Sequence, residues 1–163
     1  MPVADGADPR ATPLEVGDVA ADFVLPDGER NEIRHSDYTA GRAAVVVFFP
    51  WAFSSVCTAE LCGVRDRMPE LSNDAAATVA ISCDATASLR ELTRQQGLPY
   101  PVLSDHWPHG QVASAFGVFD PALGAAMRAT YVLDADRVVR WRVLNAVPDA
   151  RDVDDYVRVL GTL

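Results

Sequence analysis

The chain has 163 residues, which suits one domain and is long enough to bury a core without a disulfide or a metal. Hydrophobic residues make up 49% and charged residues 23%, which excludes a largely disordered chain. The formal net charge is −9 and every cation is an arginine, so we expect no catalytic lysine, no nucleic-acid partner and no anionic membrane partner.

The amino terminus predicts neither a signal peptide nor a membrane anchor. Residues 1–12 lack a basic and an apolar segment, and we interpret them as a flexible lead-in to a single domain over residues 13–163. The longest apolar stretch, residues 43–53, is interrupted by Pro50 and is too short to span a bilayer. Three cysteines, an odd number, argue against a secreted disulfide scaffold and for a reducing cytoplasm.

The first predicted strands lie on either side of a turn. Residues 22–25 are a short strand candidate that ends at a Pro-Asp-Gly turn. Residues 43–49 are apolar at every position and β-branched in the middle, a pattern typical of a central strand that is buried on both faces.

A helix is predicted after Pro50. Apolar residues recur at steps of four and three from Cys57 to position 71, which places them on one face of a helix. Ser54 or Ser55 is a suitable N-cap. Because Pro69 lies inside this pattern, we expect a kink or an end of the helix close to it.

The rest of the chain predicts further alternation and then a hairpin. In order, the expected elements are a buried strand at 78–83, a helix at 87–96, a short strand at 102–103, a short helix at 109–116, strands at 129–133 and 138–144, and a helix at 152–160. The turn at 134–137 predicts an antiparallel hairpin. This order predicts an α/β fold with a central mixed β-sheet and helices on both faces.

The position of Cys57 in the first turn of a helix is the main chemical signal. Backbone N–H groups and the positive end of the helix dipole lower the pKa of a cysteine at such a position. A free cysteine on an apolar stripe is also often a small core residue. The position by itself leaves a reactive thiol and a packed thiol open.

The segment around Cys57 resembles the signature of the peroxiredoxins, thiol peroxidases on a thioredoxin-like fold. Pro50, Ser54 and Cys57 match the pattern P-x-x-x-[TS]-x-x-C. The resemblance extends from about Leu14 to the carboxyl end and includes residues 127–134, which are similar to the strand with the family's second catalytic motif.

A second stretch is similar to one branch of the family. Residues 104–110, followed by Ala115-Phe116-Gly117-Val118, resemble the AhpE-type branch found in actinobacteria.

The resemblance implies catalytic roles for several side chains. Cys57, as a thiolate, would attack a peroxide and become a sulfenic acid, while the Ser54 hydroxyl contacts the peroxide and Pro50 shields the sulfur. Arg128 would place a permanent cation beside the thiolate and the leaving oxygen. Without the resemblance, Arg128 reads as a solvated arginine at a strand end. The family usually has threonine where Ser54 stands.

Two further residues are candidates for supporting the site. Glu60 lies one turn after Cys57 and either pairs with a nearby arginine to fix the site or is a solvated helix carboxylate. Trp107 either lines the substrate entrance or packs in the core.

The sequence gives weak support for a metal site. His106 and His109 are three residues apart, and Cys57 and Cys62 have a spacing that two zinc ligands allow. Convincing further ligands are missing, so loop histidines are the favoured interpretation and no metal is expected. Cys83 ends a buried strand and is expected to be an inert packed thiol.

Cys62 has the spacing of a resolving cysteine. In PrxQ-type members of the family, a cysteine five residues after the peroxidatic one resolves the sulfenic acid. Five residues of an intact helix separate two Cα atoms by about 8.7 Å, whereas a disulfide needs them within about 7 Å. A Cys57–Cys62 disulfide therefore requires the first turns of the helix to unwind, and Gly63 weakens the helix beyond Cys62.

The role of Cys62 has an alternative. We expect its side chain on the wet side of the helix, beside Thr58 and Asp66. There it could be an ordinary surface thiol, with an outside thiol resolving Cys57 directly, as in one-cysteine members of the family.

The sequence thus predicts a cytoplasmic thiol peroxidase that reduces hydrogen peroxide, organic hydroperoxides or peroxynitrite with no cofactor besides its own cysteines. The resemblance implies thioredoxin, mycoredoxin or a low-molecular-weight thiol such as mycothiol as the reductant, and it allows a homodimer. Two other functions stay open. One is a thiol–disulfide oxidoreductase, which normally shows C-x-x-C after the first buried strand, and the other is a non-enzymatic sensor switched by oxidation of Cys57.

Overall fold

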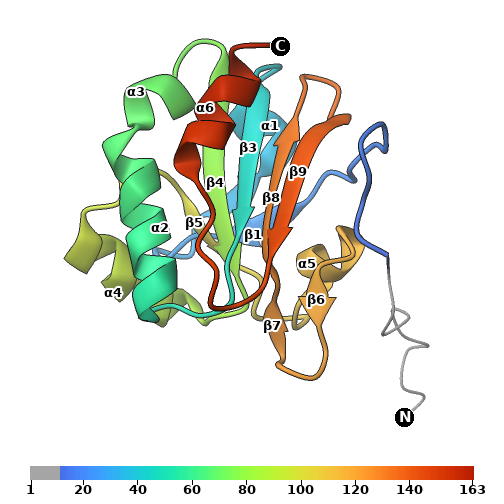
Figure 1. Cartoon of the computed structure of the whole chain (residues 1–163). Coiled ribbons are helices and arrows are strands. Elements are labelled where there is room, and N and C mark those ends of the chain that lie inside the picture. The colour runs from blue at the N-terminus through green and yellow to red at the C-terminus, as the bar shows by residue number, and fades with distance from the viewer. Residues whose placement is uncertain (1–11) are drawn as a thin grey trace.

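A five-stranded mixed sheet forms the centre of the molecule (Figure 1). The computed structural model describes residues 12–163, so the predicted lead-in lies outside the described residues except for Thr12. The strand order is β5-β4-β3-β8-β9, with bounds Val102–Ser104, Ala76–Ser82, Ala43–Phe48, Arg128–Leu133 and Val139–Asn145. Strands β3, β4 and β5 are parallel, and β8 runs antiparallel to both β3 and β9. The predicted mixed sheet and the β8–β9 hairpin are confirmed.

Helices cover both faces of this sheet, as predicted. On one face lie α2 (Ser55–Asp66), α3 (Met68–Leu71), α4 (Thr86–Gln96) and α6 (Val153–Leu160), and on the other lie α1 (His35–Thr39) and α5 (Gln111–Ala115). Alternate side chains of β3 serve the two cores: Val45 and Val47 pack toward α2, and Val46 and Phe48 pack toward α5. Because both faces are covered, the strand is apolar at every position.

The start and end of α2 follow local rules. The Ser54 side chain caps the helix by accepting a hydrogen bond from the backbone N–H of Cys57. The helix ends at Asp66, and Pro69 falls in the first turn of α3, where the missing N–H of proline is harmless. The predicted break near Met68 is confirmed.

Several short elements have no clear signal in the sequence. These are β2 (Glu32–Arg34), the helix α1, and the small hairpin of β6 (Phe119–Asp120) and β7 (Ala125–Ala126). The strand predicted at 22–25 is present as β1 (Val24–Pro26), which pairs with β2. The predicted helix at 109–116 is shorter because Gly110, in the left-handed region at φ +69°, starts α5 at Gln111. Within residues 12–163, every helix is too short or too polar to cross a membrane.

Candidate active site

Cys57 occupies the first turn of α2 with its side chain turned toward the sheet. It is 0% exposed and packs in the apolar core beneath the helix. The Ser54 Oγ accepts a hydrogen bond from the Cys57 backbone N–H at 3.2 Å, and Pro50, which is buried, lies two residues after the end of β3. The loop between them is fixed because Ala52 donates its N–H to Asp84 Oδ2 at 2.9 Å. The chain thus puts a packed cysteine at the positive end of a helix.

Arg128 is the first residue of β8 and lies beside this cysteine. Because β8 runs antiparallel to β3, its first residues meet the end of β3, where Ala129 pairs with Phe48. The arginine is 1% exposed, its Nη2 lies 3.5 Å from the Cys57 Sγ, and its Nε donates to the Val147 carbonyl at 2.9 Å. The interpretation of Arg128 as a solvated strand-end residue is wrong.

Glu60, one helical turn after Cys57, bridges two buried arginines. Its Oε1 pairs with Arg128 Nη1, and its Oε2 accepts from the Nε and the backbone N–H of Arg151, each at 2.7 Å. Burial raises the pKa of Glu60, but the hydrogen bonds and charge of Arg151, together with Arg128, outweigh it, so the pKa lies below its usual value. Of the two interpretations of Glu60, pairing with arginine is the one observed.

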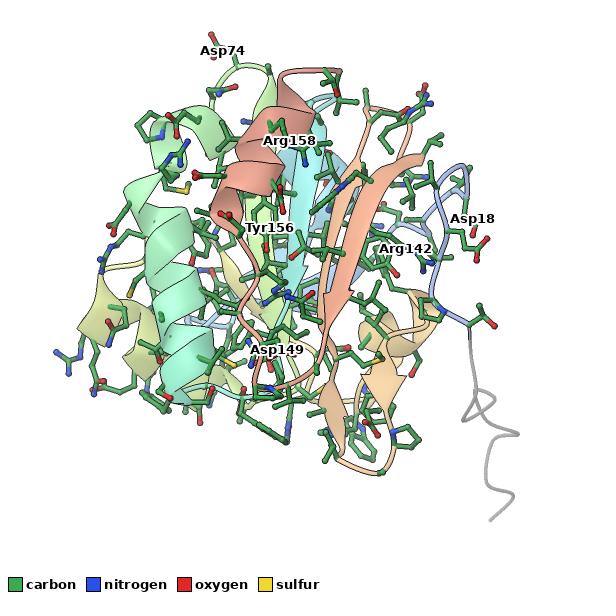
Figure 2. The ribbon with its side chains drawn as sticks, in the orientation of Figure 1. Asp18, Asp74, Arg142, Asp149, Tyr156 and Arg158 are labelled. Atoms are coloured by element: carbon green, nitrogen blue, oxygen red, sulfur yellow. The ribbon has the colours of Figure 1, made fainter. Side chains whose placement is uncertain are left out.

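Arg151 is a central residue of the site that the sequence analysis missed. It lies just before α6, and its Nη1 donates to the carbonyls of Phe48 and Ala129 at 2.6 and 2.7 Å. The same Nη1 lies 3.1 Å from Thr130 Oγ1, and that hydroxyl also contacts Tyr156 of α6, which projects toward the sheet (Figure 2). The only sequence signal for Arg151 is a lone arginine within an acidic segment.

The charges of this network leave a net positive charge beside Cys57. Arg128 and Arg151 contribute two positive charges and Glu60 one negative charge, and all three side chains are almost fully buried. The remaining positive charge lies on the side of the sulfur where Arg128 Nη2 approaches it. Such a fixed charge can stabilise negative charge that develops on a reacting group beside the sulfur.

Cys62 points away from Cys57 and toward the neighbouring helix. Its Sγ donates to Gln96 Oε1 on α4 at 3.3 Å, and the side chain is half-buried. The expectation that Cys62 lies on the water-facing side of the helix is only partly right, because α4 packs beside α2 and leaves the side chain half-buried (Figure 1). Within the described chain, Cys57 and Cys62 are both free thiols.

This arrangement has a counterpart in a known family. The AhpC/TSA family matches the chain over residues 16–142, a range that includes Cys57, Glu60 and Arg128. The chain belongs to the AhpC/TSA family. The resemblance to the peroxiredoxins is thereby confirmed.

Individual relatives agree with this assignment. Alkyl hydroperoxide reductase E of Mycobacterium tuberculosis is 37% identical over 150 residues, which cover 92% of this chain and 98% of that protein. The crystal structure of peroxidoxin BcpB from the same organism has a TM-score of 0.83 at 32% identity, covering 92% of this chain and 98% of that one. AhpC of Enterococcus faecalis has a TM-score of 0.81 at 27% identity, covering 90% of each chain. The protein is therefore a peroxiredoxin, a thiol-dependent peroxidase on a thioredoxin-like fold.

Trp107 of this peroxiredoxin lies on the loop between β5 and α5. It is 84% exposed, so its interpretation as a core residue is wrong. Within residues 12–163, its side chain makes no hydrogen bond that ties it to Cys57 or Arg128. Its predicted place at the substrate entrance therefore stays a proposal.

The two neighbouring histidines use their ring nitrogens on backbone carbonyls. His109 Nδ1 and Nε2 lie 2.9 and 2.7 Å from the carbonyl oxygens of His106 and Gly124, and His106 Nδ1 lies 3.2 Å from that of Cys83. Within residues 12–163, no group of three or more His, Cys, Asp or Glu side chains is arranged to hold a metal ion. His106 and His109 are thus loop histidines that connect segments of the backbone.

Cys83 of the peroxiredoxin is a packed thiol. It follows β4 and is buried, and burial together with the Asp105 and Asp84 carboxylates raises its pKa to about 12. A thiol with such a pKa is almost entirely protonated at neutral pH, and the thiolate is the reactive form. The expectation of an inert cysteine agrees with this environment.

Proposed function

We propose that the protein reduces hydrogen peroxide, organic hydroperoxides and peroxynitrite at Cys57. The observation that carries the proposal is the 3.5 Å approach of Arg128 Nη2 to the Cys57 Sγ inside a network fixed by Glu60. The thiolate attacks one peroxide oxygen, a sulfur–oxygen bond forms and the oxygen–oxygen bond breaks. The departing oxygen takes a proton and leaves as water or an alcohol, and Cys57 becomes a sulfenic acid.

Each side chain around the Cys57 sulfur has a separate role in this step. Arg128 stabilises negative charge on the departing oxygen, as preorganised donors do in other transition states. The Ser54 hydroxyl accepts the Cys57 N–H bond and still has its own hydrogen to donate to the peroxide. Pro50 keeps bulk water from the sulfur.

We propose that Cys62 completes the cycle. The Cys62 sulfur attacks the Cys57 sulfur, the sulfenic oxygen leaves with the Cys62 proton as water, and a Cys57–Cys62 disulfide forms. Thioredoxin, mycoredoxin or a low-molecular-weight thiol then reduces this disulfide. The five-residue spacing supports the proposal, and the similarity to alkyl hydroperoxide reductase E supports the class of substrate.

We also propose a cytoplasmic location and a homodimer for this peroxidase. Three free cysteines suit a reducing cytoplasm. Several exposed apolar side chains would gain cover in a homodimer, among them Trp51, Phe53, Trp107 and Leu123. We propose that Trp107 lines the substrate entrance, which its exposure allows.

Rapid mixing with peroxide tests the first step. The fluorescence of Trp51, six residues before Cys57, should change with a rate proportional to peroxide concentration, and Cys57→Ser should abolish the change. A sensor would react orders of magnitude more slowly, and a thiol–disulfide oxidoreductase would reduce a model disulfide faster than a peroxide. Mass spectrometry after one equivalent of peroxide tests the second step. A persistent sulfenic acid on Cys57 with Cys62 free would overturn resolution by Cys62.

A further inference from the structure

The carboxyl-terminal half of α2 is tied to α4 and to the loop that follows α4. Cys62 Sγ donates to Gln96 Oε1 at 3.3 Å, and Arg65 Nη1 donates to the Gln96 carbonyl at 2.6 Å. The Tyr100 hydroxyl donates to the Leu61 carbonyl at 2.7 Å in a buried position. These hydrogen bonds join residues 61–65 to residues 96–100, and we call them the α4 latch.

The latch holds Cys62, the cysteine that must move for a disulfide to form. In the reduced protein, the Cys62 side chain points to α4 while the Cys57 side chain points to the sheet and Arg128. A disulfide needs the two Cα atoms within about 7 Å, closer than an intact helix allows. Forming the bond therefore requires α2 to unwind and the Cys62 sulfur to leave Gln96.

The latch contacts favour the reduced state of the protein over the disulfide state. A thiol donates its hydrogen to Gln96 Oε1, but a disulfide sulfur has no hydrogen, so the contact exists only before resolution. The Tyr100–Leu61 bond likewise favours the helical conformation of the carbonyl that it holds. Both interactions stabilise the reduced, helical state against the unwound state that leads to the disulfide.

We propose that Gln96 and Tyr100 are positioning residues that hold Cys62 away from Cys57 and so set the lifetime of the sulfenic acid. The inference rests on the proposed resolution by Cys62. During that lifetime a second peroxide can oxidise Cys57 again: its sulfenic sulfur gains an oxygen, the peroxide leaves as water or an alcohol, and a sulfinic acid results. The latch therefore controls how oxidised Cys57 divides between the disulfide and the sulfinic acid.

Two test substitutions each remove one hydrogen bond of the latch and keep the approximate size of the side chain. Gln96→Met deletes Oε1 and keeps the length of the side chain, Tyr100→Phe deletes only the hydroxyl, and Gln96→Glu keeps an acceptor for the Cys62 thiol. Gln95→Met is the matched control, because Gln95 is the exposed neighbour whose amide bonds to Glu91 on α4 itself. Circular dichroism at 25 °C verifies that each variant is folded.

Two readouts follow from mixing each variant with peroxide. The first fluorescence phase reports oxidation of Cys57 and the second reports disulfide formation, and acid-quenched samples show the disulfide and sulfinic fractions by mass. Loss of one neutral hydrogen bond should speed the second phase by about threefold to tenfold in Gln96→Met and Tyr100→Phe. The same variants should form less sulfinic acid at a given excess of peroxide. Gln96→Glu, whose carboxylate accepts more strongly from the thiol, should not speed the second phase, and Gln95→Met should behave like the wild type.

The outcomes separate the latch from the reaction on which it acts. If the wild type forms the disulfide but the second phase of Gln96→Met and Tyr100→Phe is unchanged or slower, the latch is overturned and resolution by Cys62 stands. A uniform change in all four variants, the Gln95→Met control included, overturns it as well. If the wild type forms no Cys57–Cys62 disulfide, resolution by Cys62 fails and the latch fails with it. Faster resolution with less sulfinic acid, confined to the two latch variants, supports it.

Discussion

The guanidinium of Arg128 lies 3.5 Å from the sulfur of Cys57, although 71 positions separate the two residues in the sequence. Both are buried, so little solvent screens the interaction between the cation and a thiolate. Glu60 holds the same guanidinium from its other side. Arg128 is thus fixed before the substrate arrives, which is the condition under which a charge contributes most to catalysis.

Removing this cation should slow the reaction. Arg128→Ala takes away the donor that stabilises the departing oxygen, and we expect peroxide to oxidise Cys57 more than tenfold more slowly. The measurement is the second-order rate constant from stopped-flow fluorescence. Arg140→Ala is the control, since Arg140 is an exposed arginine of β9 that pairs with Asp134. A normal rate in Arg128→Ala would contradict the assigned role.

Arg151 should matter for the stability of the fold as well as for the site. Arg151→Ala leaves Glu60 with one partner fewer and leaves the carbonyls of Phe48 and Ala129 without their donor. We expect the free energy of unfolding to fall by about 3–5 kcal/mol, as for other broken buried pairs, and urea titration measures it. Arg158→Ala should change it by less than about 1 kcal/mol, because the Arg158–Asp155 pair is exposed.

Ser54 combines a cap with a hydroxyl for the substrate. Ser54→Ala should lower the free energy of unfolding by about 1 kcal/mol through loss of the cap, and it should slow peroxide reduction. Ser54→Thr keeps the hydroxyl and should preserve both properties. Ser55→Ala, at the exposed first residue of α2, is the control. Equal rates for Ser54→Ala and the wild type would confine Ser54 to capping.

His35 should make stability depend on pH. It is buried and stacks on Phe23 with ring centroids 4.8 Å apart, and burial lowers its pKa to about 4. The unfolded chain binds a proton at His35 below a pH of about 6.5, whereas the folded chain does so only near 4. The stability that neutral His35 contributes is therefore complete above about 6.5 and is lost as the pH falls from there to about 4.

Asp105 acts in the opposite direction over nearly the same range. Burial raises its pKa to about 6, so the folded chain keeps this proton after the unfolded chain has lost it. Its contribution is complete below the unfolded pKa, near 4, and is lost as the pH rises through about 6. The two groups offset each other in the wild type, so a variant of one of them is needed.

His35→Phe isolates the histidine. Between pH 7.5 and pH 5, the unfolding free energy of the variant should improve relative to the wild type by about 2 kcal/mol, because only the wild type loses the His35 contribution. Urea titrations of both proteins at the two pH values measure the difference. His35→Gln, which cannot titrate, should show the same trend. A difference between variant and wild type that does not change with pH would contradict it.

The sequence by itself determined the features that depend on near neighbours along the chain. The apolar run of β3, the cap at Ser54, the break at Pro69 and the place of Cys57 in the first turn of a helix all follow from spacing and backbone chemistry within a few residues. The order of strands and helices then predicted the mixed sheet. The short β2 and β6–β7 elements escaped prediction because two or three residues make too short a pattern, whereas β1 was predicted from the turn that follows it.

Only the tertiary structure decided which side chains meet at the site. The Glu60–Arg128 and Glu60–Arg151 pairs span 68 and 91 positions, and the Cys62–Gln96 contact spans 34. A side chain that is polar along its own helix or strand can be buried by an element that arrives from elsewhere in the chain. Arg128 and Arg151 are such cases, because Glu60 of α2 pairs with both of them in the buried site. Cys62 is half-buried because α4 lies against it. Trp107 is the reverse, an apolar residue that no packed element covers within residues 12–163.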